Sequence, residues 1–121
     1  EFLEMNIRER LEIADIYNKE LINNNWIKKP LSEKNKIHSW HLYVIKVKKY
    51  RDQLIDYLAK EKVSTLIHYP LLPFQQNPYE KFKPLNFQET KINQEIISLP
   101  FYPGIPREHI LRVCQLINKF C

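Results

Sequence analysis

The stretch from Thr65 to Tyr79 reads TLIHYPLLPFQQNPY and gives the sharpest local signals in the sequence. The β-branched and apolar run over residues 63–69 predicts a short strand. Pro70 should end its pairing, because proline has no N–H to donate to a sheet. The loop that follows carries apolar side chains and two amides: Leu71, Leu72, Phe74, Tyr79, Gln75 and Gln76. Such a loop either packs on its own domain or forms a site that a partner outside this chain covers, and the sequence leaves both interpretations open.

The elements before this stretch are predicted from hydrophobic periodicity. Apolar residues at helical spacing predict a long helix over residues 3–23, and the breadth of its apolar stripe predicts contacts on two sides. Alternation predicts a strand over residues 37–48, with its first half buried on both faces. A helix over residues 51–62 leads into the strand at 63, with Lys62 at a position that favours glycine.

The elements after this stretch are shorter and richer in proline. Residues 80–87 are expected to be irregular, and residues 88–97 to form a helix with Ile92 and Ile96 inward. Residues 98–106 should form a rigid extended turn that leads into a last helix ending near residue 120, whose stripe is Ile110, Val113, Cys114, Ile117 and Phe120. The sum is a small α+β unit, in which helices pack on a short, mainly antiparallel sheet behind a long leading helix.

Composition narrows the class of protein only moderately. The 121 residues form one domain or a piece of a larger one. A net charge of +5 fits an anionic ligand or nucleic acid, but a generally lysine-rich surface is the better explanation of the charge by itself. No apolar run reaches the length of a membrane span. Two cysteines, Cys114 and Cys121, without a zinc-type spacing indicate a reducing, cytoplasmic setting.

Few residues have a pattern typical of chemistry. A single glycine, Gly104, argues against a glycine-rich phosphate loop. His68 beside Tyr69 could act in proton transfer or hold a phosphate or hydroxyl group, while a structural histidine at a strand end is an equal alternative. His38 and His41 should lie on opposite faces of a strand and so cannot share a metal ion.

Four segments give the sequence a family resemblance, in the family's order and over nearly the whole chain: residues 7–17, 38–44 (HSWHLYV), 51–70 (RD through HYP) and 98–105 (SLPFYPGI). They resemble the C-terminal part of the DegT/DnrJ/StrS family of pyridoxal-phosphate-dependent sugar aminotransferases. Two positions depart from the family pattern: Phe74 stands where a second histidine is frequent, and Lys62 stands where glycine is usual.

The resemblance implies an aspartate-aminotransferase type of fold. Residues 1–25 would then form a long helix linking to a large domain upstream, and residues 26–121 the small C-terminal domain. The upstream domain would bind pyridoxal 5'-phosphate and carry the Schiff-base lysine, so no catalytic or cofactor-binding residue is expected here. The implied substrate-binding residues are His68 and Tyr69, with Gln76 and Tyr79 as further candidates.

The function implied is transfer of an amino group, from glutamate, to a nucleotide-linked keto sugar, in the biosynthesis of cell-surface polysaccharides or secondary metabolites. The enzyme would be a cytoplasmic homodimer without nucleic-acid or membrane partners, and this chain alone would be inactive.

Three alternatives stay open: a dehydratase of the same family, a non-catalytic homologue, and a standalone module that stacks single-stranded nucleic acid on Trp40, Tyr43 and Tyr69. Strand alternation places Trp40 and Tyr43 on opposite faces, which counts against the last.

Overall fold

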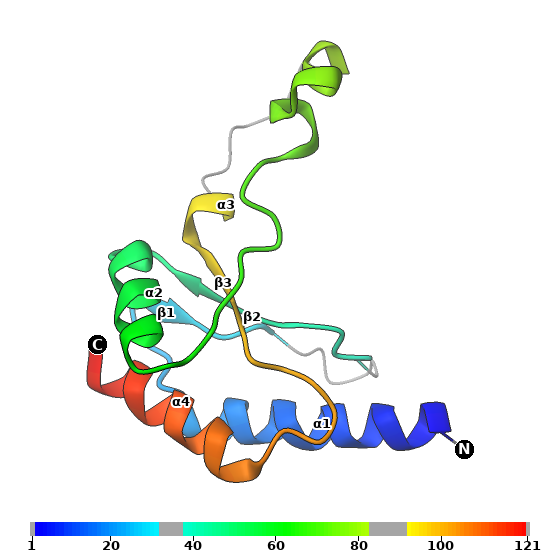
Figure 1. The fold of residues 1–121 in the computed structure, drawn as a ribbon, viewed down its shortest axis with the longest axis vertical. Coiled ribbons are helices and arrows are strands. Elements are labelled where there is room, and N and C mark those ends of the chain that lie inside the picture. Colours follow the sequence, from blue (N-terminus) through cyan, green and yellow to red (C-terminus); the bar gives the residue numbers. More distant parts are fainter. Residues whose placement is uncertain (1, 32–37, 83–91, 121) are drawn as a thin grey trace.

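The computed structural model describes residues 2–31, 38–82 and 92–120 and confirms the α+β class (Figure 1). The order of elements in this part of the chain is α1 (Phe2–Glu20), β1 (Ile27–Lys28), β2 (Tyr43–Val47), α2 (Arg51–Lys60), the 3-10 turns η1 (Pro73–Gln75) and η2 (Asn77–Phe82), α3 (Ile92–Glu95), β3 (Ile96–Leu99) and α4 (Arg107–Phe120). The strands form one antiparallel sheet in the order β1-β2-β3.

One hydrophobic core joins the sheet to the three longer helices. The second half of α1 packs along α4, and α2 and α4 lie together beside the sheet (Figure 1). The inward stripe of α4 is buried as predicted at Ile110, Val113, Cys114 and Ile117. The first half of α1 is different, because Leu3 is 71% exposed. The predicted second contact surface of this helix is therefore not covered within the described chain.

Stacked aromatic rings connect α1 to the middle strand. The ring of Tyr17 stacks on the ring of Tyr43 with 4.7 Å between centroids, and the ring of Trp40 also stacks on Tyr43, at 5.4 Å. The Tyr17 hydroxyl donates to the carbonyl oxygen of Pro100 at 2.8 Å, and the Tyr43 hydroxyl donates to Asn18 Oδ1 at 2.7 Å. Both hydroxyls thus keep a partner inside the core, as buried tyrosines require.

The strand predicted over residues 37–48 is shorter in the structure, where β2 spans Tyr43–Val47. Trp40 has a φ of +47°, so the extended backbone cannot continue through it. The Arg10 guanidinium holds this bend by donating to the carbonyl oxygens of Trp40 and His41. The predicted alternation was therefore wrong here: Trp40 turns to the same side as Tyr43, and His41 is exposed. Residue 37 lies outside the described residues.

The strand predicted over residues 63–69 is also wrong, because only Leu66 pairs, in a single bridge to Ser98. The true edge strand is β3, within residues that had been assigned to a helix and a turn. Of the helix predicted over residues 88–97, the described residues include α3, which ends at Glu95, and Ile92 is exposed rather than inward. Pairing of β3 with β2 overrides local helical spacing at this point. Residues 83–91 lie outside the described residues.

The remaining expectations differ in their outcome. Lys62 has a φ of +61°, which confirms the left-handed position predicted for it. α1 ends at Glu20, earlier than predicted, where Asn118 on α4 donates to the Glu20 carbonyl oxygen. The predicted connector after it contains the short strand β1, and η2 reaches Phe82 where an irregular segment had been expected.

Removal of the Tyr17 hydroxyl should destabilise the fold measurably. Tyr17→Phe leaves the Pro100 carbonyl without its donor and should lower the free energy of unfolding by about 1–2 kcal/mol. Tyr17→Ala also loses the ring stack and should cost about 3–5 kcal/mol. Urea unfolding of the two variants beside the wild type measures both. A Tyr17→Phe variant as stable as the wild type would contradict the role of the hydroxyl, and equal losses in the two variants would contradict the role of the ring stack.

The unfolding free energy should fall in alkali. Burial, and secondarily the charge of Glu20, raises the pKa of the Cys114 thiol to about 12, whereas an unfolded thiol ionises near about 8.5. Above the unfolded value only the unfolded chain releases this proton, so stability should decline by up to about 1.4 kcal/mol per pH unit. Urea titrations between about pH 8 and 10, below the range of ordinary tyrosines, test this. Cys114→Ala should flatten the decline.

Candidate functional site

The segment after Leu66 leaves the sheet and extends away from the body of the molecule, with η1 and η2 near its outer end (Figure 1). Its last backbone tie to the sheet is the Leu66–Ser98 bridge, in which each N–H donates to the other residue's carbonyl oxygen. Pro70 and Pro73 cannot donate, which is a local reason why pairing stops. We call residues 67–82 the arm.

His68 lies at the base of the arm and is held by the sheet. Its Nδ1 is 2.8 Å from the hydroxyl oxygen of Ser98, which is on β3 and only 4% exposed. A serine hydroxyl can donate or accept, so this contact orients the ring without fixing the tautomer. The imidazole is half-buried, so both the structural and the ligand-binding interpretation of His68 agree with this geometry.

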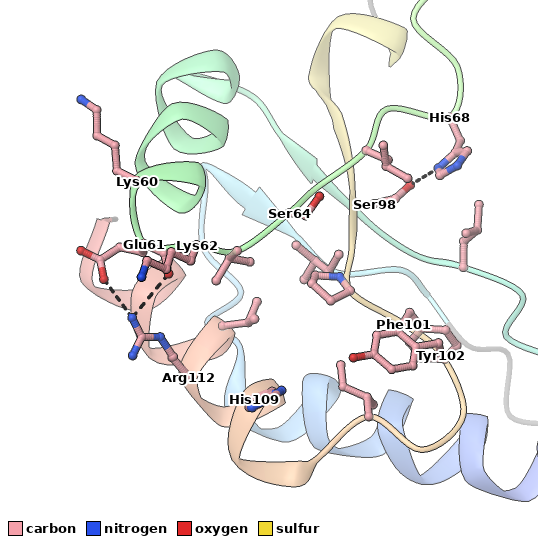
Figure 2. Close-up of a pocket in the computed structure, with 17 residues that line it drawn as sticks. Lys60, Glu61, Lys62, Ser64, His68, Ser98, Phe101, Tyr102, His109 and Arg112 are labelled. Atoms are coloured by element: carbon pink, nitrogen blue, oxygen red, sulfur yellow. Dashed lines mark hydrogen bonds and ion pairs between the residues drawn. The ribbon is translucent and has the colours of Figure 1, made fainter.

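An open pocket of about 880 Å³ begins at His68 and runs to the C-terminal end of α2 (Figure 2). Its walls come from the end of α2, the Leu66 segment, β3, the 99–105 turn and α4. Apolar and aromatic side chains line much of it: Leu42, Val63, Leu66, Leu99, Pro100, Phe101, Tyr102, Ile105 and Val113. This combination of apolar walls with a few polar groups is typical of small-molecule sites.

The polar side chains of the pocket are mostly basic. Figure 2 shows Arg112 on α4 beside Glu61, with 3.1 Å between the guanidinium and the Glu61 carboxylate. Lys60 and Lys62 lie at the same end, and His109 faces the pocket from α4. Since Glu61 is paired, the lysines leave an excess of positive charge at this end, which favours an anionic ligand.

The four residues predicted to bind substrate do not all meet at this pocket. Only His68 lines it. Tyr69 contacts His68 edge-to-face, with 5.5 Å between ring centroids, but it does not line the pocket and is 72% exposed. Gln76 is exposed on the arm, and the side chain of Tyr79 lies outside the described part of the structure. For these residues the substrate-binding role stays a prediction.

Sequence reasoning missed the residues that hold this region together. Ser98 was assigned to a turn, because the strand that buries it exists only through pairing with β2. Asn93, 7% exposed on α3, was likewise missed. Arg112 falls on the outward face of the last helix, and its partner Glu61 is 51 residues away in the chain. Such non-local contacts leave no periodic signal in the sequence.

The exposed aromatic platform needed for nucleic acid is incomplete. Trp40 and Tyr43 are buried in the core, so they cannot stack bases with Tyr69. In residues 2–31, 38–82 and 92–120, no three His, Cys, Asp or Glu side chains gather as metal ligands would. The described helices include none with the length and apolarity of a membrane-spanning segment.

A pyridoxal phosphate site needs a lysine amine and an acidic group for the pyridine nitrogen. Among the described residues of the pocket, Lys60 and Lys62 are exposed to solvent, and Glu61 is already bound to Arg112. The described residues of this pocket therefore do not fit that cofactor by themselves.

Comparisons with known proteins place this geometry in one family. The sequence model of the DegT/DnrJ/EryC1/StrS aminotransferase family matches residues 1–118. A dTDP-3-amino-3,6-dideoxy-alpha-D-galactopyranose transaminase from Aneurinibacillus thermoaerophilus is 37% identical over 98% of this chain and 32% of its own length. The chain thus spans about a third of that relative.

Solved structures agree in fold. DesV from S. venezuelae, in complex with a ketimine intermediate, superposes with a TM-score of 0.85 at 24% identity, covering 97% of this chain and 32% of its own. NtdA from Bacillus subtilis, with bound cofactor PMP, superposes with a TM-score of 0.77 at 28% identity. The match covers 94% of this chain and 28% of the NtdA chain. The first likeness concerns the fold alone.

The hydrogen bond between His68 and Ser98 should contribute to stability. Ser98→Ala removes a buried partner and should lower the free energy of unfolding by about 1 kcal/mol. Ser64 lines the same pocket but is exposed, so Ser64→Ala should change the free energy of unfolding by less than about 0.5 kcal/mol. Urea unfolding of both variants measures the difference. A Ser98→Ala variant as stable as Ser64→Ala would show that the contact holds nothing.

Proposed function

The chain belongs to the DegT/DnrJ/EryC1/StrS aminotransferase family, and we propose that it forms the small C-terminal domain of a pyridoxal-phosphate-dependent sugar aminotransferase. The observation that carries this proposal is the family match over residues 1–118, in a chain that covers about a third of its relatives. On this proposal, α1 links to a larger domain that holds the cofactor. The remaining residues, from about Trp26 onward, form the small domain.

The proposed reaction moves an amino group from an amino acid, glutamate in our proposal, to a keto sugar linked to a nucleotide. A relative named for a dTDP-linked amino sugar supports this substrate class. The positive charge around Lys60 and Lys62 agrees with a phosphate-bearing substrate. The cofactor, when bound, supplies the electron sink for the transfer.

This chain's own residues would bind and orient the sugar substrate. His68, oriented by its contact with Ser98, would meet a hydroxyl or phosphate oxygen with its Nε2 atom. Tyr69, Gln76 and Tyr79 would add contacts along the arm. Phe74, at the position where the family resemblance implies a second histidine, would supply an apolar contact instead.

The same proposal includes a cytoplasmic homodimer with active sites at the subunit interface. Leu66, Tyr69 and Leu71 expose large apolar surfaces along one continuous segment, and such surfaces are typical of interaction sites. Cys114 is a buried free thiol, which agrees with a reducing compartment.

The test is the activity of the full-length gene product. With pyridoxal phosphate, glutamate and a nucleotide-linked keto sugar, it should form 2-oxoglutarate and the amino sugar, while the 121-residue chain alone should not. Loss of water from the sugar, without amino transfer, would establish the dehydratase instead. Turnover by the 121-residue chain alone would contradict an upstream lysine.

His68→Ala in the full-length protein should raise the KM for the nucleotide sugar about tenfold through loss of one positioned hydrogen bond. His41→Ala is the matched control, because this imidazole is exposed outside the pocket. Steady-state kinetics with varied sugar measures both. Equal effects in the two variants would remove His68 from the substrate site.

A further inference from the structure

Asn93 is a buried polar residue for which neither the sequence motifs nor the proposed reaction supplies a role. It lies on the short helix α3 and is one of two buried polar side chains among the described residues; the other is Ser98. Its amide nitrogen donates to the carbonyl oxygen of Pro70 at 2.8 Å and to Gln75 Oε1 at 3.2 Å. A buried side-chain amide with two hydrogen-bond partners on one loop is typical of a specific structural contact.

The partners of Asn93 fix the direction of its amide. A carbonyl oxygen can only accept, so Pro70 requires the NH₂ group of Asn93. Gln75 Oε1 also accepts the backbone N–H of Leu72 at 2.8 Å, which can only donate. Both Oε1 contacts therefore need donors, and a carboxylate at position 93 could satisfy neither Pro70 nor Gln75.

The helix that carries Asn93 is itself tied to the body of the molecule. Glu95 on α3 forms an ion pair with Lys46 of β2 at 2.9 Å. The Arg51 guanidinium, at the start of α2, lies 3.5 Å from the Asn93 carbonyl oxygen. Figure 1 shows α3 at the outer end of β3, beside the lower part of the arm. Asn93 thus connects the arm to α3, which is itself held against the sheet and the start of α2.

Among the described residues, the side chains of Ser98 and Asn93 connect the α3–β3 unit to the arm beyond the Leu66–Ser98 bridge. Ser98 holds His68, and Asn93 holds Pro70 and Gln75. His68, Tyr69 and Gln76 lie within or directly beside the span between these contacts. A change at Asn93 should therefore displace several proposed substrate contacts together.

We propose that Asn93 is a positioning residue that sets the geometry of the arm for the sugar substrate, without touching the substrate itself. This inference rests on the proposed function, because the arm positions a sugar only if the parent protein acts on one. On this proposal, a residue of α3 that does not line the pocket affects specificity in the half-reaction that transfers the amino group to the sugar.

The experiment uses Asn93→Asp in the full-length protein with pyridoxal phosphate bound. The substitution keeps the size of the side chain and replaces both donor hydrogens by an acceptor, so kcat/KM for the nucleotide sugar should fall about tenfold. The reaction with the amino donor alone, followed by the change in cofactor absorbance, should stay within about twofold, because that half-reaction needs no sugar contact.

The matched control is Gln94→Glu, the same amide-to-carboxylate change at the next residue, whose side chain is exposed. It should leave both half-reactions within about twofold. Gln75→Glu keeps an oxygen acceptor for both Leu72 and Asn93 and should remain close to wild type, whereas Gln75→Met removes it and should resemble Asn93→Asp. An equal loss in both half-reactions of Asn93→Asp would indicate a general structural role and overturn the proposal.

Hydrogen exchange gives a readout that does not depend on activity. Amide exchange over residues 70–76 should accelerate about tenfold in Asn93→Asp and remain unchanged in Gln94→Glu. Unchanged exchange together with unchanged sugar kinetics would overturn the proposal. A wild-type protein that does not transaminate would refute the proposed function and with it the role in sugar positioning, while faster exchange would still show that Asn93 holds the arm.

Discussion

The stacking of Tyr17 on Tyr43 is the interaction on which the rest of this fold depends. It joins the long leading helix to the middle strand, and the Tyr17 hydroxyl adds a bond to the carbonyl of Pro100, 83 residues away. That bond fixes the exit of β3, from which the 100–106 turn sets the start of α4. The Tyr17 side chain therefore connects α1, β2 and the end of β3, which are distant in sequence. Because two large aromatic rings are buried, this contact contributes several kcal/mol to the free energy of unfolding.

Different interactions hold the body of the molecule and the arm. In the body, apolar burial sets the positions of the helices and strands, and this interaction is strong and non-directional. Beyond the Leu66–Ser98 bridge, the arm has few buried residues, and its described ties include the imidazole of His68 and the amide of Asn93. Such hydrogen bonds are directional and individually weak. They suit a segment that must be placed accurately and yet be able to adjust when a ligand arrives.

The sequence predicted the longer helices of the fold and missed the strand that builds the site. α1, α2 and α4 follow from periodicity, and Lys62 follows from the absence of glycine at a helix end. β3 could not be predicted, because four residues have no period of their own and become a strand only by pairing with β2. His68 was found through its motif, whereas Ser98 and Asn93 depend on that unpredicted strand and on the short helix before it. Contacts of this kind are decided by tertiary structure, which a single sequence does not encode locally.

Exposed apolar residues on α1 and on the arm indicate contacts with another part of a longer protein. Leu3 and Met5 lie on the first half of α1, and Leu66, Tyr69 and Leu71 lie along the start of the arm, all with large solvent-exposed surfaces. Exposure of large apolar side chains on two separate elements is costly unless another surface covers them. Relatives about three times as long as this chain offer such a surface. Our proposal divides the work between the two parts of the protein. His68 and the arm would select the sugar, while the part that covers them would hold the cofactor and carry the chemistry of the amino group.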